Sequence, residues 1–170
     1  NLRVSRFNNG DTIPEVKSDL AWINRQSSAC CSYNNDKSND LNLGKLYNGY
    51  VLTESRNACP IGWRIPGPDD WRNLFFHFGV SINGFIGRID STIGGALKAK
   101  SSLWNSPNYG ATDIIGFSAL PAGYRGIDST TSNNFHSKGM GTYFWSTDFS
   151  SNLINYGLYY LNANIIGDGA

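Results

Sequence analysis

The sequence predicts an α+β fold, with helices in the first half of the chain and short, irregular antiparallel strands and long loops in the second half. Two observations carry this prediction. Residues 68–78 have the apolar periodicity of a helix, whereas from Ser81 onward glycines and turn residues separate short apolar segments that are typical of strands. A run of helices followed by a run of strands is characteristic of the α+β class.

The N-terminal segment contains a strand, a turn and a short helix by this interpretation. Residues 2–7 alternate between apolar and polar side chains, which predicts a strand, and Asn8–Asp11 supplies a turn after it. Ser18 is a suitable N-cap for a short helix over residues 19–25.

The following segment is less regular. Residues 26–42 are polar and rich in turn formers, including the loop Tyr33–Asp36. Residues 46–53 carry apolar side chains at a helical spacing, although Gly49 lowers the helix propensity. We therefore expect a loop and then a weak helix here.

The strongest helix prediction covers Pro68–Phe78. Pro68 suits the first turn of a helix, and the two carboxylates that follow it lie near the positive end of the helix dipole. Gly79 is a suitable residue for ending the helix. Four apolar residues fall at i, i+3, i+4 and i+7 and form one stripe that we expect in the core: Trp71, Leu74, Phe75 and Phe78.

Three apolar segments predict strands in the second half, at residues 117–124, 143–147 and 153–161. The last of them has apolar side chains on both faces, which indicates a central strand. The chain has no internal repeat and no low-complexity linker, so we expect one domain over residues 1–170.

Composition excludes several classes of function. Charged residues make up 16% of the chain, below the usual share of about 25%, and 14 Lys and Arg balance 13 Asp and Glu. A nucleic-acid binder needs a basic face, so we expect no nucleic-acid partner. No apolar run approaches about 18 residues, so we expect no transmembrane segment. The 20 Asn, 19 Ser, 19 Gly and 9 Tyr suit turns and adaptable binding surfaces.

The cysteines leave two alternatives open. An odd number of three leaves at least one of them unpaired within this chain. Adjacent cysteines rarely bridge each other, so a disulfide would join Cys30 or Cys31 to Cys59, and we take Cys31–Cys59 as the candidate pair. Three buried free thiols are the alternative. With only His77 and His136 as imidazole ligands and no C-x-x-C pair, we expect no zinc site.

The sequence contains no recognisable catalytic or metal-binding pattern. Neither histidine lies in a nucleophile motif, and Gly94–Gly95 lacks the Lys-Ser/Thr of a phosphate-binding loop. Calcium requires clustered oxygen ligands, and the available ones are dispersed: Asp128, Asn133, Asn134 and Asp148. We predict no enzymatic activity and no cofactor, with calcium kept as the alternative.

Three segments of the chain carry a family resemblance, and they occur in the family's order. The hallmark segments are Cys59–Pro66 with the pair Asp70–Trp71, then Ala111–Arg125, and then Phe144–Thr147. Shorter similarities lie at residues 6–11, 33–36 and 44–48. These segments resemble the Fibrobacter succinogenes major paralogous domain family over nearly the whole chain.

The resemblance implies a C-type-lectin-like fold, which is distantly similar to the formylglycine-generating enzymes. It also implies an extracytoplasmic protein, at the cell surface with an outer-membrane association or secreted, commonly a lipoprotein or a module of a larger protein. The family's usual lead-in and final strand are missing here, so we expect the chain to be a portion of a longer one. Formylglycine-generating chemistry needs a late redox-active cysteine pair, whereas every cysteine here precedes Pro60.

The hallmark residues have packing roles by physical argument. We expect Trp63 to enter the core beside the helix, and Arg125 to pair with an acidic loop residue. The second hallmark is expected to be a kinked strand where another backbone passes closely. The residues assigned structural roles are Trp63, Trp71, Gly116, Pro121, Gly123 and Trp145.

Two loops are candidate binding surfaces, because loops carry function while strands position them. The first, residues 126–142, is rich in Ser, Thr and Asn. The second, residues 105–109, offers Tyr109 as an aromatic platform for sugar. The candidate ligand contacts are Tyr109, Asn133, Asn134, Phe135 and His136.

The loops, together with the setting that the resemblance implies, predict a non-catalytic surface or secreted recognition module that binds glycan or protein through its loops. The first alternative is a structural or accessory subunit of an outer-membrane, secretion or adhesion assembly. The remote alternative is a degenerate relative of the formylglycine-generating enzymes.

Overall fold

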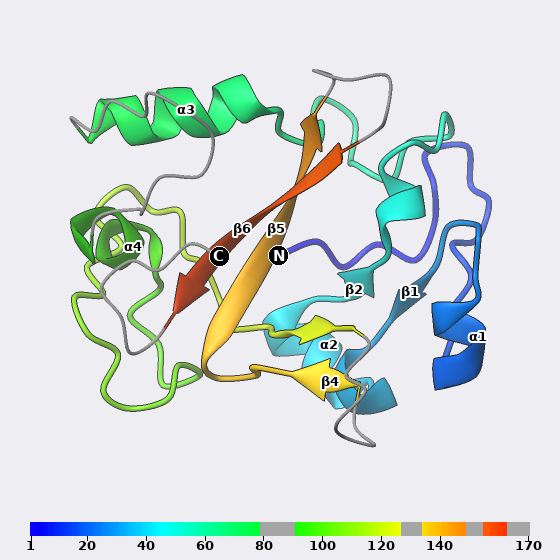
Figure 1. Ribbon diagram of the computed structural model, residues 1–170, viewed down its shortest axis with the longest axis horizontal. Helices are drawn as coiled ribbons and strands as arrows, with labels where there is room; N and C mark the ends of the chain where they lie inside the picture. The colour runs from blue at the N-terminus through cyan, green and yellow to red at the C-terminus, as the bar shows by residue number, and fades with distance from the viewer. Residues whose placement is uncertain (79–90, 127–133, 149–154, 163–170) are drawn as a thin grey trace. The chain divides into compact units, whose positions relative to one another are not determined.

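Figure 1 shows the computed structural model, which describes residues 1–78, 91–126, 134–148 and 155–162. The chain divides into two compact units, each described here by itself. Unit 1 comprises Asn1–Ile65 and Ala122–His136, and unit 2 comprises Pro66–Pro121 and Ser137–Ala170.

Both units combine helices with short antiparallel strand pairs, which confirms the α+β class. Unit 1 contains α1 (Asp19–Ile23), β1 (Cys30–Cys31), η1 (Tyr33–Asn35), α2 (Ser38–Leu43), β2 (Leu46–Tyr47), η2 (Gly49–Val51), β3 (Tyr124–Arg125) and β4 (Phe135–His136). Unit 2 contains α3 (Pro68–His77), α4 (Ser91–Leu97), β5 (Gly141–Asp148) and β6 (Asn155–Asn162).

The N-terminal segment forms a turn rather than the predicted strand. The amide of Phe7 donates to the carbonyl of Asp11 at 2.8 Å, and Gly10 has a φ of 91°, as the predicted turn requires. Residues 2–7 form only one isolated bridge, from Arg6 to Thr12. The predicted cap is confirmed, since the Ser18 side chain accepts from the Ala21 amide at the start of α1.

Of the weak helix predicted over residues 46–53, only the 3-10 turn η2 at Gly49–Val51 is helical. Leu46 and Tyr47 pair with β1 instead, in the register Cys30↔Tyr47. Asn48 explains the difference, because its side-chain oxygen accepts from the Ala29 amide at 3.0 Å. An Asn side chain that satisfies a neighbouring backbone competes with helix formation.

Two apolar clusters form the core of unit 1. The first contains Phe7, Ile13, Cys30, Val51 and Ala58, with Val4 and Tyr47 packed against it. The second contains Cys31, Tyr33 and Phe135, with Trp22 and Leu46 packed against it.

Arg125 joins distant parts of unit 1. Its guanidinium donates to the carbonyl of Val16 at 2.6 Å and to that of Lys17 at 2.8 Å. It also pairs with Asp19 at 2.5 Å, so the predicted ion pair forms, although its acid lies in α1 and not in a loop. The guanidinium carbon lies 4.7 Å from the ring centroids of both Trp22 and Phe135. A fully buried cation is thus matched by carbonyls, a carboxylate and two aromatic faces.

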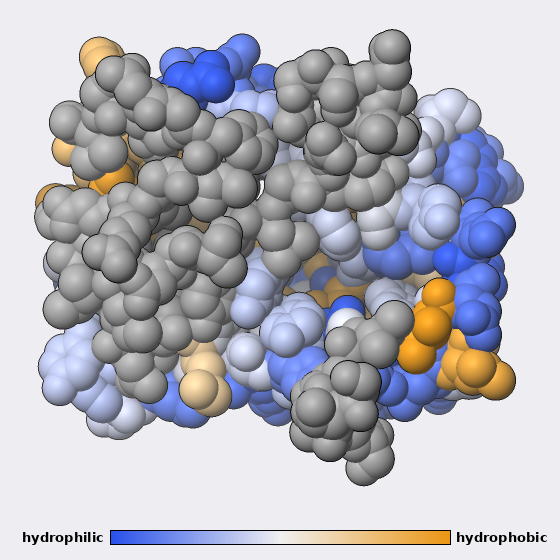
Figure 2. Space-filling model, viewed as in Figure 1, coloured by the Kyte–Doolittle hydropathy of each residue, from blue (hydrophilic) through white to orange (hydrophobic). Residues whose placement is uncertain are grey.

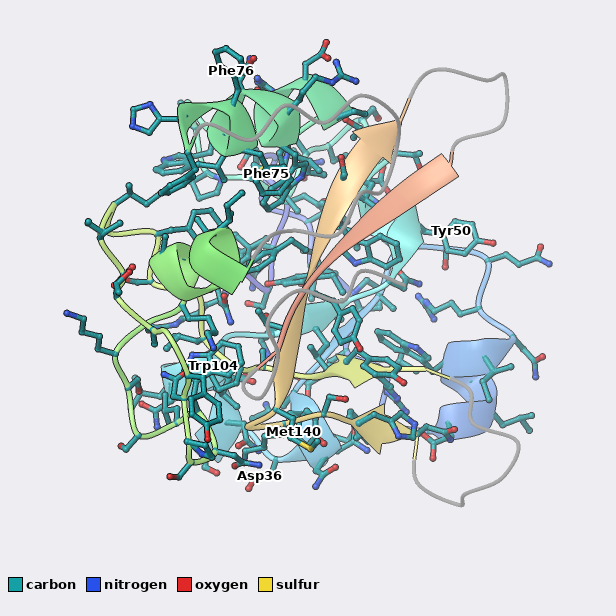
Figure 3. All side chains as sticks on the ribbon, turned by 60° about the vertical axis from the view of Figure 1, so that its left-hand side comes forward. Asp36, Tyr50, Phe75, Phe76, Trp104 and Met140 are labelled. Atoms are coloured by element: carbon teal, nitrogen blue, oxygen red, sulfur yellow. The ribbon has the colours of Figure 1, made fainter. Side chains whose placement is uncertain are left out.

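The predicted helix over residues 68–78 is confirmed as α3. Asp70 accepts from the Gly67 amide at 2.7 Å and so caps the helix start. The predicted stripe also lies in the core, where Trp71 and Phe75 are buried and Leu74 and Phe78 pack against them. Figure 3 shows Phe75 beneath α3 and Phe76 on its outer side. Gly79 lies outside the described residues.

The core of unit 2 has contributions from a helix that the sequence did not predict. Ile93 and Leu97 of α4 join Trp71, Phe75, Trp104 and Ala119 in one buried cluster. Phe144 of β5 packs against the same cluster. The sequence did not predict this helix because it contains Gly94 and Gly95, and glycine has a low helix propensity.

The strand predictions of the second half have mixed outcomes. β5 and β6 pair antiparallel over eight residues each and contain the predicted segment 143–147 and most of segment 153–161. Within the described residues β6 has β5 as its one partner, so its predicted central position is not observed. Segment 117–124 is not a continuous strand: it holds one parallel bridge, Lys98↔Ala119, and the first residue of β3.

The hallmark residues occupy partly different environments from those predicted. Trp71 and Pro121 are buried as expected, and Trp145 is half-buried on β5. Trp63 is 73% exposed, so the prediction that it enters the core is wrong.

The glycines of the second hallmark serve backbone conformation. Gly116 has a φ of 69°, and no other atom lies within 4 Å of where its Cβ would be, so conformation and not a closely passing backbone explains it. Gly123 also has a positive φ, of 65°.

Replacing Arg125 with Met should destabilise the protein by about 3 kcal/mol, because the substitution leaves Asp19 without its cation and the Val16 carbonyl without its charged donor. The measurement is urea unfolding followed by tryptophan fluorescence. Arg3→Met is the control, since Arg3 is exposed. Equal losses of stability in the two variants would contradict the role of Arg125.

Candidate functional site

The structure describes Gly126 and residues 134–142 of the first candidate loop, residues 126–142. Asn133 lies outside the described residues. Asn134 is half-buried: its carbonyl accepts from the Gly126 amide at 2.9 Å, and its side chain hydrogen-bonds to Asp19. Together with Arg125, this bond lowers the pKa of Asp19. Asn134 is therefore engaged within unit 1.

The two neighbouring candidates also pack inward. Phe135 is 7% exposed, and its ring centroid lies 5.3 Å from that of Tyr33. We therefore place Phe135 in the core and do not carry it forward as a ligand contact. The half-buried His136 lies against the ring of Tyr124 at 5.1 Å. Its Nε2 atom is buried without a hydrogen-bond partner among the described residues.

The second candidate loop presents an aromatic side chain to solvent. Tyr109 is 60% exposed and lies in residues 101–118 of unit 2, which we call the Tyr109 loop. Asp113 is the one charged residue in this stretch of sequence, and Asn105 and Ser106 are exposed beside the tyrosine. An uncharged polar surface around an exposed ring can bind a ligand by stacking and hydrogen bonding.

Trp104 fixes the first part of the Tyr109 loop. Its indole is 3% exposed, and its Nε1 donates to the carbonyl of Ala119 at 3.0 Å. The same carbonyl accepts from the Ala99 amide at 3.0 Å, and the Ala119 amide donates to Leu97 at 2.9 Å. These bonds tie both ends of the loop to the C-terminus of α4. Figure 3 labels Trp104.

Lys98 fixes the middle of the Tyr109 loop through a hydrogen bond to its backbone. Lys98 is buried, with 2% of the residue exposed, and its Nζ donates to the Tyr109 carbonyl at 2.8 Å. Nζ also lies 5.5 Å from the Trp104 ring centroid. Burial lowers the pKa of Lys98. Lys98 was not among the predicted site residues, although a single lysine inside the apolar run 96–99 is a signal that it is buried.

A second turn in the loop exposes aliphatic side chains. Asp113 accepts from the Ser118 amide at 2.7 Å and from the Ser118 hydroxyl at 2.5 Å, which closes the turn. Ile114 is 75% exposed and Ile115 39% exposed at its tip. Phe117 partly folds inward, with its ring centroid 5.5 Å from that of Phe144.

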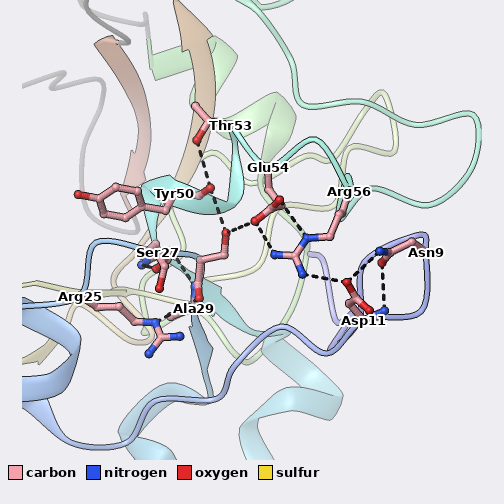
Figure 4. A network of polar contacts seen from close by, with 11 residues as sticks. Asn9, Asp11, Arg25, Ser27, Ala29, Tyr50, Thr53, Glu54 and Arg56 are labelled. Carbon is pink, nitrogen blue, oxygen red and sulfur yellow. Dashed lines mark hydrogen bonds and ion pairs between the residues drawn. The ribbon is translucent and has the colours of Figure 1, made fainter.

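A separate polar network lies in unit 1 (Figure 4). Arg56 pairs with Glu54 at 2.6 Å and with Asp11 at 3.0 Å, and Asn9 donates to Asp11 at 2.9 Å. The bond from Asn9, followed by that from Arg56, lowers the pKa of Asp11, and the bond from Arg56 lowers that of Glu54. Both carboxylates thus face a guanidinium, so the network connects a turn to a loop and offers no open cation site.

No metal-binding cluster of three or more His, Cys, Asp or Glu side chains occurs in the parts of the chain that the structure describes. Of the dispersed oxygen donors considered for calcium, Asp128 and Asn133 lie outside those parts. None of the helices in the same parts is long and apolar enough to cross a membrane.

The candidate disulfide between Cys31 and Cys59 is not formed. Cys30, Cys31 and Cys59 are all free and buried in unit 1. Burial raises the pKa of Cys30 to about 11, and it also raises the pKa values of Cys31 and Cys59. The thiol alternative is therefore the one that the structure supports.

Native protein should react with iodoacetamide at pH 8 far more slowly than unfolded protein at all three cysteines. Burial blocks access of the reagent, and the raised pKa of each thiol keeps the reactive thiolate rare. Mass spectrometry counts the modified thiols with and without guanidinium chloride. Two residues that stay unmodified after unfolding without reductant would indicate a disulfide and contradict the structure.

Comparisons with known proteins give one match. No curated protein and no solved structure matches the chain. Among protein families, the Fibrobacter succinogenes major domain matches residues 1–166. The match confirms the resemblance expected from the three hallmark segments, and it spans both units. The chain therefore belongs to the Fibrobacter succinogenes major domain family.

Proposed function

We propose that this chain is a non-catalytic recognition module that binds an uncharged glycan through the Tyr109 loop. The observation that carries the proposal is an exposed aromatic ring on a backbone that buried side chains hold in place. Tyr109 is 60% exposed, while Lys98 and Trp104 beneath it are 2% and 3% exposed. A ring presented in this way offers contact area without a large entropic cost of ordering.

The chemistry of the loop favours a neutral ligand. The stretch 101–112 contains no charged residue, and the ammonium of Lys98 is buried against the Tyr109 carbonyl, so this stretch exposes no charged side chain of its own to phosphate or carboxylate groups. The exposed amide of Asn105 and hydroxyl of Ser106 can exchange hydrogen bonds with sugar hydroxyls. The apolar face of a pyranose ring is complementary to the face of Tyr109.

The proposal extends to fold and location. A C-type-lectin-like arrangement and an extracytoplasmic setting, at the cell surface or secreted, agree with the α+β composition, the neutral surface and the family. The three free thiols supply no disulfide in support of an oxidising compartment.

Tyr109→Ala should lower glycan affinity about tenfold, the equivalent of 1.4 kcal/mol, because the stacking face is lost. Tyr109→Phe should keep most of the affinity. The measurement is a glycan array with and without calcium, followed by titration of the best ligand. Tyr50→Ala is the matched control, since Tyr50 is a 43% exposed tyrosine of unit 1. An array without any signal, or equal losses in the two alanine variants, would contradict the proposal.

A second candidate function is that of an accessory subunit that docks on a protein of a larger envelope assembly. Exposed apolar side chains in unit 1 favour it. Ile61 is 93% exposed and Trp63 73% exposed on one tight turn, where the Trp63 amide donates to Pro60. Figure 2 shows hydrophobic surface over α1, where Leu20 is 71% exposed. Exposed aromatic and aliphatic residues are enriched at protein interfaces.

For the accessory role, Trp63→Ser should abolish cross-linking of the protein to its envelope partner, because the docking side chain is removed. Phe76→Ser is the control, since Phe76 is 71% exposed on the outer side of α3 in unit 2. Thermal unfolding checks that both variants stay folded. If the Trp63→Ser variant still cross-links to the partner, this turn is not the docking surface.

A further inference from the structure

The C-terminal end of α4 touches the Tyr109 loop at two points. One is Gly95 in the helix, and the other is Lys98, the residue that directly follows the helix and whose amide still donates to the Gly94 carbonyl at 3.1 Å. The first point is a contact between two backbones, and the second is the buried ammonium of Lys98. Gly95 has no side chain and the side chain of Lys98 is buried, so neither contact involves an exposed side chain.

The backbone contact depends on the absence of a side chain at Gly95. A Cβ built there would overlap the carbonyl oxygen of Gly110 and lie 2.8 Å from its carbonyl carbon. The Gly95 carbonyl in turn accepts from the Thr112 amide at 2.8 Å. Gly110 itself has a φ of 65°, which other residues adopt with strain. The turn that carries Tyr109 therefore rests directly on the helix backbone.

The ammonium contact lies on the other side of the same turn. Lys98 Nζ donates to the carbonyl of Tyr109, and Asn108 Nδ2 donates to that of Ala99 at 3.1 Å. These bonds hold the main chain on both sides of the exposed ring. The Tyr109 side chain itself stays free to meet a ligand, because its fixed position comes from its backbone.

We infer that the C-terminal end of α4, through Gly95 and the following Lys98, is a positioning surface that sets the orientation of Tyr109 for ligand. The consequence of this inference for binding rests on the proposed function, whereas the effect of the surface on the turn can be measured without any ligand. Closing the turn before binding removes the cost of ordering it afterwards, so affinity depends on a helix end that the ligand does not contact.

The first test compares two adjacent glycines of one helix. Gly95→Ala forces the turn off α4, whereas Gly94→Ala has open space, with nothing within 4 Å of its Cβ. Chymotrypsin cleavage after Tyr109 reports opening of the turn, and cleavage after the buried Phe75 reports global unfolding. We expect Gly95→Ala to raise cleavage after Tyr109 about tenfold at unchanged cleavage after Phe75, and Gly94→Ala to leave both unchanged.

The second test uses the charge of Lys98. Lys98→Met removes the donor and should raise cleavage after Tyr109 about tenfold, while Lys98→Arg keeps a donor and should restore protection. Burial lowers the pKa of Lys98, so the open turn binds the proton more tightly than the closed one. Closure should then become more favourable as pH rises through that lowered pKa toward 10.5, the ordinary value. Wild-type cleavage after Tyr109, relative to Tyr50, should therefore fall with pH, and Lys98→Arg should show no such fall.

The outcomes separate this inference from the proposed function. Unchanged cleavage after Tyr109 in both Gly95→Ala and Lys98→Met overturns the positioning role, whatever the array shows. Looser turns together with a wild-type array without signal leave the positioning of the turn supported and overturn the glycan proposal. Looser turns with full glycan affinity overturn the link between the two. The inference expects looser turns and affinity reduced about tenfold.

Discussion

Buried cations that donate to backbone carbonyls are the interaction on which the irregular parts of this protein depend. Most strand pairs are two residues long, so ladder hydrogen bonds satisfy few carbonyls. In unit 1 Arg125 donates to the carbonyls of Val16 and Lys17, and in unit 2 Lys98 donates to the carbonyl of Tyr109. A long side chain can reach a carbonyl that no ladder satisfies, and the aromatic rings beside each cation replace part of its lost hydration.

Sequence periodicity predicted the elements whose own residues determine them. α3 has a complete apolar stripe and a carboxylate cap, so its local pattern and its packing agree, and the short apolar segments of the second half indicated the paired strands β5 and β6. The errors lie where a distant contact decides. The Asn48 side chain bonds to another segment and replaces the expected helix with β2. The glycines that concealed α4 include Gly95, whose missing side chain makes room for Gly110, a contact that pattern alone cannot reveal.

The candidate site was predictable in its exposed part and hidden in its buried part. A neutral loop with one tyrosine indicates a contact surface from sequence alone, whereas Lys98 looks like any other lysine until its burial is known. Phe135 shows the opposite error, because an aromatic residue beside a polar loop was assigned to the surface and instead packs on Tyr33 and Arg125. Trp63 was assigned to the core because of its neighbours in a motif, yet the turn at Gly62 directs it outward.

The division between buried support and exposed contact has a consequence for how this surface can vary. Many of the bonds that fix the Tyr109 loop come from its backbone and from the buried Lys98, Trp104 and Gly95, and the side chains of Asn108 and Asp113 add bonds of their own. The exposed side chains of Ser106, Tyr109 and Ile114 contribute little to that support, so substitution there should change the ligand and leave the fold intact. A loop whose shape is set from beneath can therefore present different surfaces on one scaffold. Such a separation suits a recognition module better than an enzyme, in which the reactive side chains must themselves be held.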